Sequence, residues 1–259
     1  MGVLNVTPDS FSDGGRYAGL EEAVAHGLRL AGEGAAIIDV GGESTRPGAQ
    51  PVSLADELAR VVPVIEALRK ASPAIVSVDT SKPEVMRAAA RAGAGLINDV
   101  RALRAPGALA AAAASGCAVC LMHMQGEPAT MQQAPHYADV TAEVRAFLEE
   151  RAAVARAAGL APDQLLVDPG FGFGKNMTHN LTLLRELRSI TAGAVPVLVG
   201  LSRKSLIGTL TGKAAAERVH GSVALAVLAV AQGARIVRAH EVAATVDALK
   251  VTAAVIGGG

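Results

Sequence analysis

The chain is 259 residues long, which fits either one large α/β domain or two small domains. Because 24 Lys and Arg residues balance 24 Asp and Glu residues, the net charge is zero, and the chain lacks the basic excess of nucleic-acid-binding and polybasic membrane-surface proteins. Hydrophobic residues make up 51% of the chain and charged residues 19%, a composition that supplies a core and argues against intrinsic disorder.

Short apolar runs alternate along the chain with longer amphipathic or Ala-rich segments, a pattern typical of repeated βα units on a parallel sheet. Strands are predicted at residues 3–5, 36–40, 74–78, 95–98, 118–122, 165–167, 197–199 and 235–237. Helices are predicted at residues 20–33, 53–71, 83–92, 106–115, 139–158, 177–190, 214–232 and 241–256. Each predicted strand precedes a helix and no linker divides the chain, so the sequence predicts a single (β/α)8 TIM barrel over residues 1–259. A doubly wound parallel sheet is the alternative.

The sequence predicts a cytoplasmic protein. Residues 1–5 lack the basic and apolar regions of a secretory signal. Of two uncharged stretches, residues 105–126 are interrupted by Pro and Gly, and residues 219–234 are shorter than the ~20 residues of a spanning helix. Cys117 and Cys120 have the spacing of a redox pair or half a zinc site. However, they lie three apart in an apolar strand-like run, which favours buried free thiols in a reducing compartment.

Polar or glycine-rich clusters follow the predicted strands. They include Asn5, Asp39 to Gly41, Asp79, Asn98 and Asp99, His123, Asp168 to Gly170, Gly200 to Lys204, Arg238 and His240. In a barrel the carboxyl ends of all strands share one mouth, where the active sites of this fold lie. The alternative is that strand ends are polar because loops are polar. Short Asn, Asp and His side chains, suited to direct contacts, favour a binding site.

Three polar residues, Asp79, Asn98 and Asp168, end strands that apolar residues flank. Burial of these groups requires hydrogen-bonding partners. A flat heterocycle with adjacent N–H, amine and carbonyl groups would supply them, because carboxylates accept paired donors and an amide both donates and accepts. A structural hydrogen-bond network would satisfy them equally well.

Other strand ends carry groups suited to anions. Thr45 and Arg46 follow the second predicted strand, and Arg238 and His240 follow the eighth. Asn5 offers a neutral oxygen that could hold hydrated Mg²⁺ together with substrate phosphates. The segment 202–205 opens a predicted short helix through residue 210, whose N–H groups favour a carboxylate or phosphate.

Two nucleotide motifs are excluded. The segment GFGFGKN at residues 170–176 lacks the first glycine and the final hydroxyl residue of a Walker loop. The chain also lacks the glycine fingerprint and downstream acid of a dinucleotide fold.

Seven motifs lie at the ends of the predicted strands. They are GVLNVTPDSFSDGG at residues 2–15, DVGGESTRPG at 39–48, SVDTSKP at 77–83, IND at 97–99, MHMQG at 122–126, DPGFGFGKN at 168–176 and SRKS at 202–205. With these motifs the chain closely resembles the dihydropteroate synthase family, from Gly2 to about Val242. One departure is Arg238-Ala239-His240-Glu241, where the family commonly has Arg-Val-His-Asp, so a carboxylate is kept.

The resemblance implies a reaction. It joins 6-hydroxymethyl-7,8-dihydropterin pyrophosphate to p-aminobenzoate, with Mg²⁺, to give 7,8-dihydropteroate and pyrophosphate for folate synthesis. It also implies a homodimer and a sulfonamide target. We expect the loops 5–20 and 41–53, which exceed the usual length of a βα connection, to close as lids.

The resemblance also implies roles for individual residues. Pterin binding is expected of Asp79, Asn98, Met122, Asp168 and Lys204. Pyrophosphate binding is expected of Thr45, Arg46, Arg238 and His240, with the metal on Asn5. p-Aminobenzoate binding is expected of Phe11, Pro47, Arg203, Lys204 and Ser205. The expected catalytic residues are Asp79, Lys204 and Arg238. Two other functions stay open: a cobalamin-linked pterin methyltransferase domain and a non-catalytic pterin-binding paralogue.

Overall fold

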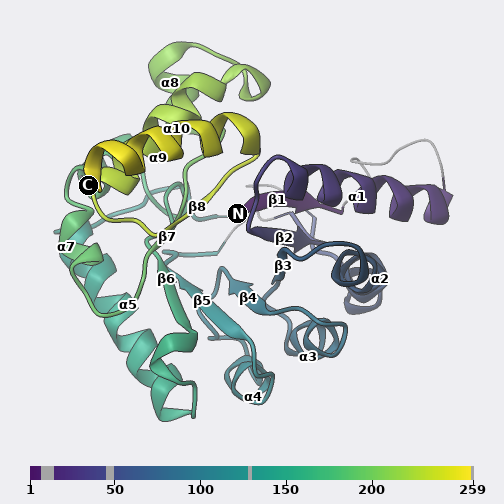
Figure 1. The fold of residues 1–259 in the computed structure, drawn as a ribbon. Coiled ribbons are helices and arrows are strands. Elements are labelled where there is room, and N and C mark those ends of the chain that lie inside the picture. Colours follow the sequence, from purple (N-terminus) through teal and green to yellow (C-terminus); the bar gives the residue numbers. More distant parts are fainter. Residues whose placement is uncertain (7–14, 45–49, 128–129, 258–259) are drawn as a thin grey trace.

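Eight parallel strands form the centre of the part of the chain that the computed structural model describes, residues 1–6, 15–44, 50–127 and 130–257. In Figure 1 they surround one axis, with helices outside. A six-stranded sheet runs in sequence order and a two-stranded sheet follows it. The strands are β1 (Gly2–Asn5), β2 (Ile37–Gly41), β3 (Ile75–Asp79), β4 (Leu96–Asp99), β5 (Ala118–Met122), β6 (Leu165–Asp168), β7 (Leu198–Gly200) and β8 (Ile236–Arg238).

Backbone contacts between the two sheets close the barrel. Gly2 forms a parallel bridge with Ala239, and the Val3 N–H donates to the Ala239 carbonyl at 3.1 Å. On the other side Val167 bridges Val197. A doubly wound sheet keeps its two edge strands apart, whereas here the first and last strands meet. The predicted (β/α)8 barrel is therefore confirmed.

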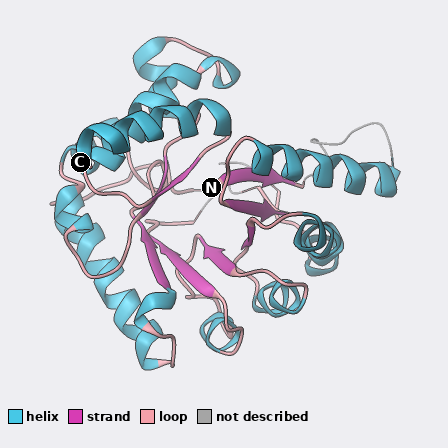
Figure 2. Ribbon diagram, viewed as in Figure 1, coloured by secondary structure: helices cyan, strands magenta, loops and turns pink. Residues whose placement is uncertain are grey.

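The helices form the outer layer of the barrel (Figure 2). None within the described residues combines the length and apolar character needed to cross a membrane. They are α1 (Gly15–Gly32), α2 (Leu54–Ala71), α3 (Pro83–Arg91), α4 (Ala108–Ala113), α5 (Val140–Ala157), α6 (Met177–Arg185), α7 (Arg188–Thr191), α8 (Ser205–Thr211), α9 (Val219–Ala231) and α10 (Val242–Ile256), with short 3₁₀ helices at Pro162–Gln164 and Ala215–Glu217.

Three predicted helix boundaries were wrong. The first helix begins at Gly15 rather than at residue 20. The predicted helix 177–190 is divided into α6 and α7, because the Leu187 and Ser189 N–H groups bond carbonyls three residues back and tighten the chain into a turn. The predicted helix 214–232 begins as a 3₁₀ turn, in which the Glu217 carboxylate accepts from the Ala214 N–H at 3.2 Å.

The core has two main layers. A large cluster lies between the strands and the helices, and a smaller one, Leu96, Cys120 and Leu198, lies inside the barrel. Cys117 belongs to the outer cluster and Cys120 to the inner one, and both are free and buried. The predicted buried thiols on opposite faces of one strand segment are therefore confirmed.

Candidate active site

Strands β1 to β4 bring polar positions to one level of the barrel mouth. In the Cα register Asn5 pairs with Gly41, Gly41 with Asp79, and Asp79 with Asn98. A Cβ added to Gly41 would lie 3.8 Å from Asn5 Oδ1 and 3.9 Å from Asp79 Oδ2. Glycine at position 41 thus leaves open space between an amide oxygen and a carboxylate that belong to different strands.

A buried carboxylate that sequence reasoning did not assign to the site lies beneath these groups. Asp39, which is 0% exposed, accepts from Asn98 Nδ2 at 3.1 Å and from Ser77 Oγ at 2.6 Å. Its Oδ2 also accepts from Arg238 Nε at 2.6 Å. Asp39 therefore fixes the direction of the Asn98 amide and anchors one edge of the Arg238 guanidinium.

Asp79 shares Arg238 with Asp39. Arg238 Nη2 donates to Asp79 Oδ2 at 3.1 Å. Burial and, next to it, the neighbouring Asp39 carboxylate raise the pKa of Asp79 to about 7, while the Arg238 guanidinium opposes the shift. Burial beside a second carboxylate therefore places Asp79 near the midpoint of its titration at neutral pH.

Lysines from the loops after β6 and β7 lie near Asp168. Burial raises the pKa of Asp168, whereas the Gly170 N–H bond at 2.7 Å and the charges of Lys204 and Lys175 lower it. Lys175 was not predicted to belong to the site, although it lies in the DPGFGFGKN motif. Its Nζ contacts His123 Nδ1 at 2.9 Å and donates to the Gly170 carbonyl at 3.0 Å. Burial lowers the pKa of Lys175 to about 7.

Lys204 lies against the same loop. Its Nζ is 4.3 Å from the centroid of the Phe173 ring, within the range of a cation–π contact. A Cβ at Gly172, where φ is +77°, would lie 3.2 Å from Lys204 Cδ. Glycine at position 172 therefore permits both the backbone conformation and the close approach of the lysine.

The loops after β7 and β8 are joined by polar contacts. Arg203 has a φ of +58° and its Nε bonds the Glu241 carboxylate. Ser202 Oγ lies 2.9 Å from His240 Nδ1 and 3.1 Å from Glu241 Oε2. Helix α8 then begins at Ser205, as predicted.

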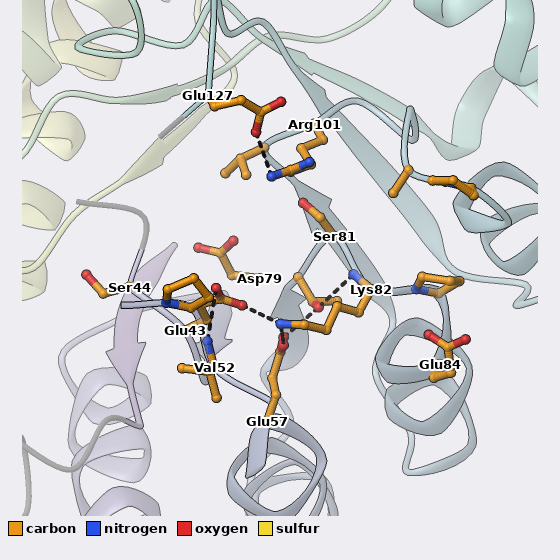
Figure 3. Close-up of a pocket in the computed structure, with 16 residues that line it drawn as sticks. Glu43, Ser44, Val52, Glu57, Asp79, Ser81, Lys82, Glu84, Arg101 and Glu127 are labelled. Atoms are coloured by element: carbon orange, nitrogen blue, oxygen red, sulfur yellow. Dashed lines mark hydrogen bonds and ion pairs between the residues drawn. The ribbon is translucent and has the colours of Figure 1, made fainter. Parts of the chain in front are cut away.

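A cavity of about 550 Å³ opens beside Asp79, between the ends of β2, β3 and β4. Figure 3 shows Lys82 among its lining residues, with Nζ between the carboxylates of Glu43 and Glu57. Thr80 Oγ1 donates to Glu57 Oε1 at 2.6 Å. Sequence reasoning missed this ion cluster, because Glu57 belongs to helix α2 and meets Lys82 only in the fold.

The structure brings together the described members of the predicted set. Asn5, Asp79, Asn98 and Arg238 lie at neighbouring strand ends, and Met122 pairs in register with Asp168. Arg203, Lys204 and His240 lie on the loops after β7 and β8, and Ser205 is the first residue of α8. Four predicted residues lie outside the described residues: Phe11, Thr45, Arg46 and Pro47.

Asn5, the predicted metal ligand, suits a Mg²⁺ ion that has few protein ligands. Among the described residues no group of three or more His, Cys, Asp or Glu side chains is placed to hold a metal ion. The neutral Asn5 oxygen faces the open space beside Gly41. Mg²⁺ keeps several waters and is often held by few protein oxygens together with substrate phosphates, which suits this donor set.

Comparisons with known proteins identify the family. A family model described as pterin binding enzyme matches residues 1–240. The dihydropteroate synthase of Escherichia coli (strain K12) is 55% identical over 256 residues, which are 99% of this chain and 91% of the relative. The solved Yersinia pestis dihydropteroate synthase in a sulfonamide drug complex has a TM-score of 0.95 and 52% identity, with 100% of this chain and 94% of that chain covered. The Xanthomonas albilineans dihydropteroate synthase with 4-aminobenzoic acid has a TM-score of 0.94 and 57% identity, with coverages of 100% and 93%. The chain therefore belongs to the pterin-binding enzymes and, within them, to the dihydropteroate synthase family.

Proposed function

We propose that the barrel mouth joins 6-hydroxymethyl-7,8-dihydropterin pyrophosphate to p-aminobenzoate, forming 7,8-dihydropteroate and releasing pyrophosphate. One observation carries the proposal: in a chain of this family, Asp79, Asn98 and Asp168 lie at the carboxyl ends of three strands that open on the same mouth. The edge of a dihydropterin offers N–H and amine donors beside a carbonyl. Two carboxylates and an amide match that sequence of donors and acceptors.

The proposed chemistry follows from the charges around Asp79 and Arg238. The C–O bond to pyrophosphate breaks, the amine of p-aminobenzoate forms the new C–N bond at the pterin methylene, and one amine proton is released. Positive charge develops on the methylene and negative charge on the leaving group. The Asp79 carboxylate stabilises the first and the Arg238 guanidinium the second, as preorganised groups whose positions are set before reaction.

The remaining residues divide between the substrates. Met122 and Lys204 pack against the pterin, and Lys204 also meets p-aminobenzoate, as does Arg203. The carboxylate of p-aminobenzoate lies at Ser205, where α8 begins. The proposal also assigns Thr45, Arg46 and His240 to pyrophosphate, and Phe11 and Pro47 to p-aminobenzoate.

We assign Mg²⁺ to Asn5 and the pyrophosphate of the substrate. A bound Mg²⁺ neutralises charge on the leaving pyrophosphate. Asn5 contributes a neutral oxygen ligand, so it adds no charge to the barrel mouth. The charge there is set by Arg238 and the carboxylates. Replacement of Asn5 by Ala is therefore proposed to raise the Mg²⁺ concentration that the reaction requires.

The proposed assembly is a homodimer of a single pterin-binding domain, residues 1–259, in the cytoplasm. Helices α9 and α10, which lie side by side in Figure 1, expose Leu228 (53%), Val251 (66%), Val255 (77%) and Ile256 (55%). Apolar side chains grouped on neighbouring helices favour a partner surface. The two free, buried cysteines suit a reducing compartment.

Thermal unfolding with ordered addition of ligands tests the proposal. The pterin pyrophosphate with Mg²⁺ raises the melting temperature first, and p-aminobenzoate or a sulfonamide raises it further only when the pterin side is filled. A pterin methyltransferase domain responds to the pterin alone. A chain that ignores the second ligand under every condition contradicts the proposal.

A further inference from the structure

Lys175 is buried beneath the loop to which it belongs, and the proposed function gives it no role. It is only 2% exposed, and a lysine is almost never buried so completely without hydrogen-bonding partners. Its Nζ donates to the carbonyls of Gly170 at 3.0 Å and Phe173 at 3.1 Å, and lies 2.9 Å from His123 Nδ1. Lys175 therefore ties the loop after β6 back on itself and joins it to the loop after β5.

The three contacts of Lys175 do not depend on whether its side chain carries the extra proton. An ammonium group donates to both carbonyls and to Nδ1 of His123. An uncharged amine donates to both carbonyls and accepts from Nδ1–H of His123. Burial lowers the pKa of His123 to about 3, so the imidazole is neutral in both arrangements. The lysine thus holds the loop in the same way on either side of its own titration.

Gly170 connects Lys175 to the Asp168 carboxylate. The Gly170 N–H donates to Asp168 Oδ1 at 2.7 Å, while the carbonyl of the same glycine accepts from Lys175 Nζ. Gly170 has a φ of +69°, a conformation that glycine adopts readily. Because one residue makes both bonds, a change in its backbone angles disturbs both together.

The side chain of Asp168 faces the inside of the barrel. Leu166 packs against the cluster inside the barrel, and Val167 belongs to the cluster between strands and helices. Successive side chains of a strand point to opposite faces, so Asp168 points inward again, at the carboxyl end of β6. The hydrogen bond from Gly170 therefore sets the orientation of a carboxylate that lies at the mouth.

Tyr137 holds a different part of the same loop. Its hydroxyl group donates to the Gly174 carbonyl at 2.8 Å, and this bond is buried. Gly174, like Gly170, has a positive φ, of +62°. Tyr137 thus fixes the later part of the loop, whereas Lys175 reaches back to the residue that bonds the carboxylate.

We propose that Lys175 is a positioning residue, which holds Gly170 so that the Asp168 carboxylate keeps the orientation in which it accepts hydrogen bonds from the pterin. The part that Asp168 plays rests on the proposed function. The link from Lys175 to Asp168 rests on the hydrogen bonds alone. Lys175 acts through Gly170, so its loss changes the affinity for the pterin by way of the loop.

Hydrogen exchange of the Gly170 amide, followed in ¹⁵N-labelled free protein, tests the link. Lys175→Met keeps a side chain of similar length but removes all three contacts, and we expect the Gly170 amide to exchange about tenfold faster. The rate is compared with that of the Val167 amide, which bonds the Pro196 carbonyl at 3.0 Å and reports the opening of the barrel itself. Lys175→Gln, a shorter amide, replaces Lys175→Met if that variant does not fold, and the same acceleration is expected.

The matched control is Tyr137→Phe. It removes one hydrogen bond to a buried carbonyl of the same loop but leaves both bonds of Gly170 in place. We expect the exchange rate of Gly170, relative to Val167, to change by less than about twofold in this variant. An unchanged relative rate in the Lys175 variant, or equal acceleration in the control, overturns the inference.

Calorimetric titration with 6-hydroxymethyl-7,8-dihydropterin pyrophosphate and Mg²⁺ tests the role. We expect Kd to rise about tenfold in Lys175→Met and less than about twofold in Tyr137→Phe. An unchanged Kd in Lys175→Met overturns the role. A weaker Kd with unchanged exchange at Gly170 assigns the effect to the charge of the lysine and overturns it as well. If the unaltered chain does not bind the pterin, the proposed function fails, while exchange at Gly170 still tests the link.

Discussion

Asp79 combines three influences at the residue scale: burial, a second carboxylate and a shared guanidinium. Because burial and Asp39 raise its pKa to about 7, a large fraction of Asp79 is protonated below neutral pH. The protonated acid cannot stabilise a developing cation. The proposed role therefore ties activity to the ionised form, which increases as pH rises.

We predict that kcat/KM for the pterin pyrophosphate rises between about pH 6 and pH 8, with a midpoint that reports the free enzyme. In Asp79→Asn this ascending limb disappears, and kcat falls on the scale of ~3 kcal/mol, or about a hundredfold, as when one preorganised group is removed. A matched control is Asp139→Asn, which changes the same atoms at the exposed N-cap of α5, where asparagine also caps well. Unchanged kcat in Asp79→Asn contradicts the role.

Among single residues, the sequence predicted the polar side chains at strand ends. It missed side chains whose importance depends on contacts that form only in the fold. Asp79, Asn98 and Asp168 were predicted because polar residues after apolar strands meet at a barrel mouth. Asp39 was not assigned, since its importance depends on Arg238, which lies 199 positions later in the chain. The buried Lys175 was missed because only the folded loop shows that its charge is enclosed by backbone carbonyls.

The loop after β6 is the element that depends most on backbone conformation. Gly170 has a φ of +69°, and a Cβ there would lie 1.9 Å from the His123 carbonyl oxygen. Gly116 has a φ of +73° but open space around the same position. Comparison of Gly170 with Gly116 therefore separates the cost of a steric clash of the added Cβ from the cost of a left-handed backbone conformation.

We predict that Gly170→Ala destabilises the protein by several kcal/mol, while Gly116→Ala costs only about 1 kcal/mol, the price of a left-handed alanine. Chemical denaturation gives both free energies of unfolding. Equal losses in the two variants would show that the loop moves to accommodate a methyl group.

The loops after β2 and β3 are linked to helix α2 by the ion cluster of Glu43, Lys82 and Glu57. Glu57 is only 1% exposed, so removal of its cation leaves a buried carboxylate without its ion pair. We predict that Lys82→Met lowers the free energy of unfolding by about 2 kcal/mol. This cost is smaller than that of breaking a fully buried ion pair, because Lys82 is 28% exposed and solvent screens its charge. Arg29→Met, which removes an exposed pair with Glu33, changes the free energy of unfolding by less than about 0.5 kcal/mol. Similar values for the two variants contradict a stabilising role of the cluster.

Element types were more predictable than element boundaries. The eight strands follow from short apolar runs, and no strand end differs from its prediction by more than one residue. Helices α6 and α7 were predicted as one, because the periodicity of apolar residues continues through the turn at Glu186 and Leu187. The turn is made by backbone hydrogen bonds that leave no mark on composition.

At the scale of the whole molecule, alternation of strands and helices predicted a barrel, and closure between β1 and β8 confirms it. The sequence did not predict which helix faces stay exposed, because Ala-rich helices pack equally well inside one chain or between two. Exposure of Val251 and Val255 on α10 turns this question into an experiment.

We predict that Val251→Lys together with Val255→Lys converts the proposed dimer to a monomer, measured as molar mass by light scattering. The two introduced lysine ammonium groups would lose their water in an apolar interface, and this cost opposes association of the two subunits. Ile75→Lys, at a site on β3 that is 49% exposed, leaves the mass unchanged. A dimer that persists in the double variant places the interface elsewhere.

One assay tests whether this chain couples the formation of 7,8-dihydropteroate to the release of pyrophosphate. The purified chain is incubated with Mg²⁺ and 6-hydroxymethyl-7,8-dihydropterin pyrophosphate, with and without p-aminobenzoate, while pyrophosphate and 7,8-dihydropteroate are both measured. We predict that p-aminobenzoate accelerates pyrophosphate release and that the two products form in equal amounts. Absence of dihydropteroate from a folded chain that binds the pterin, or pyrophosphate release that does not depend on p-aminobenzoate, would contradict the claim.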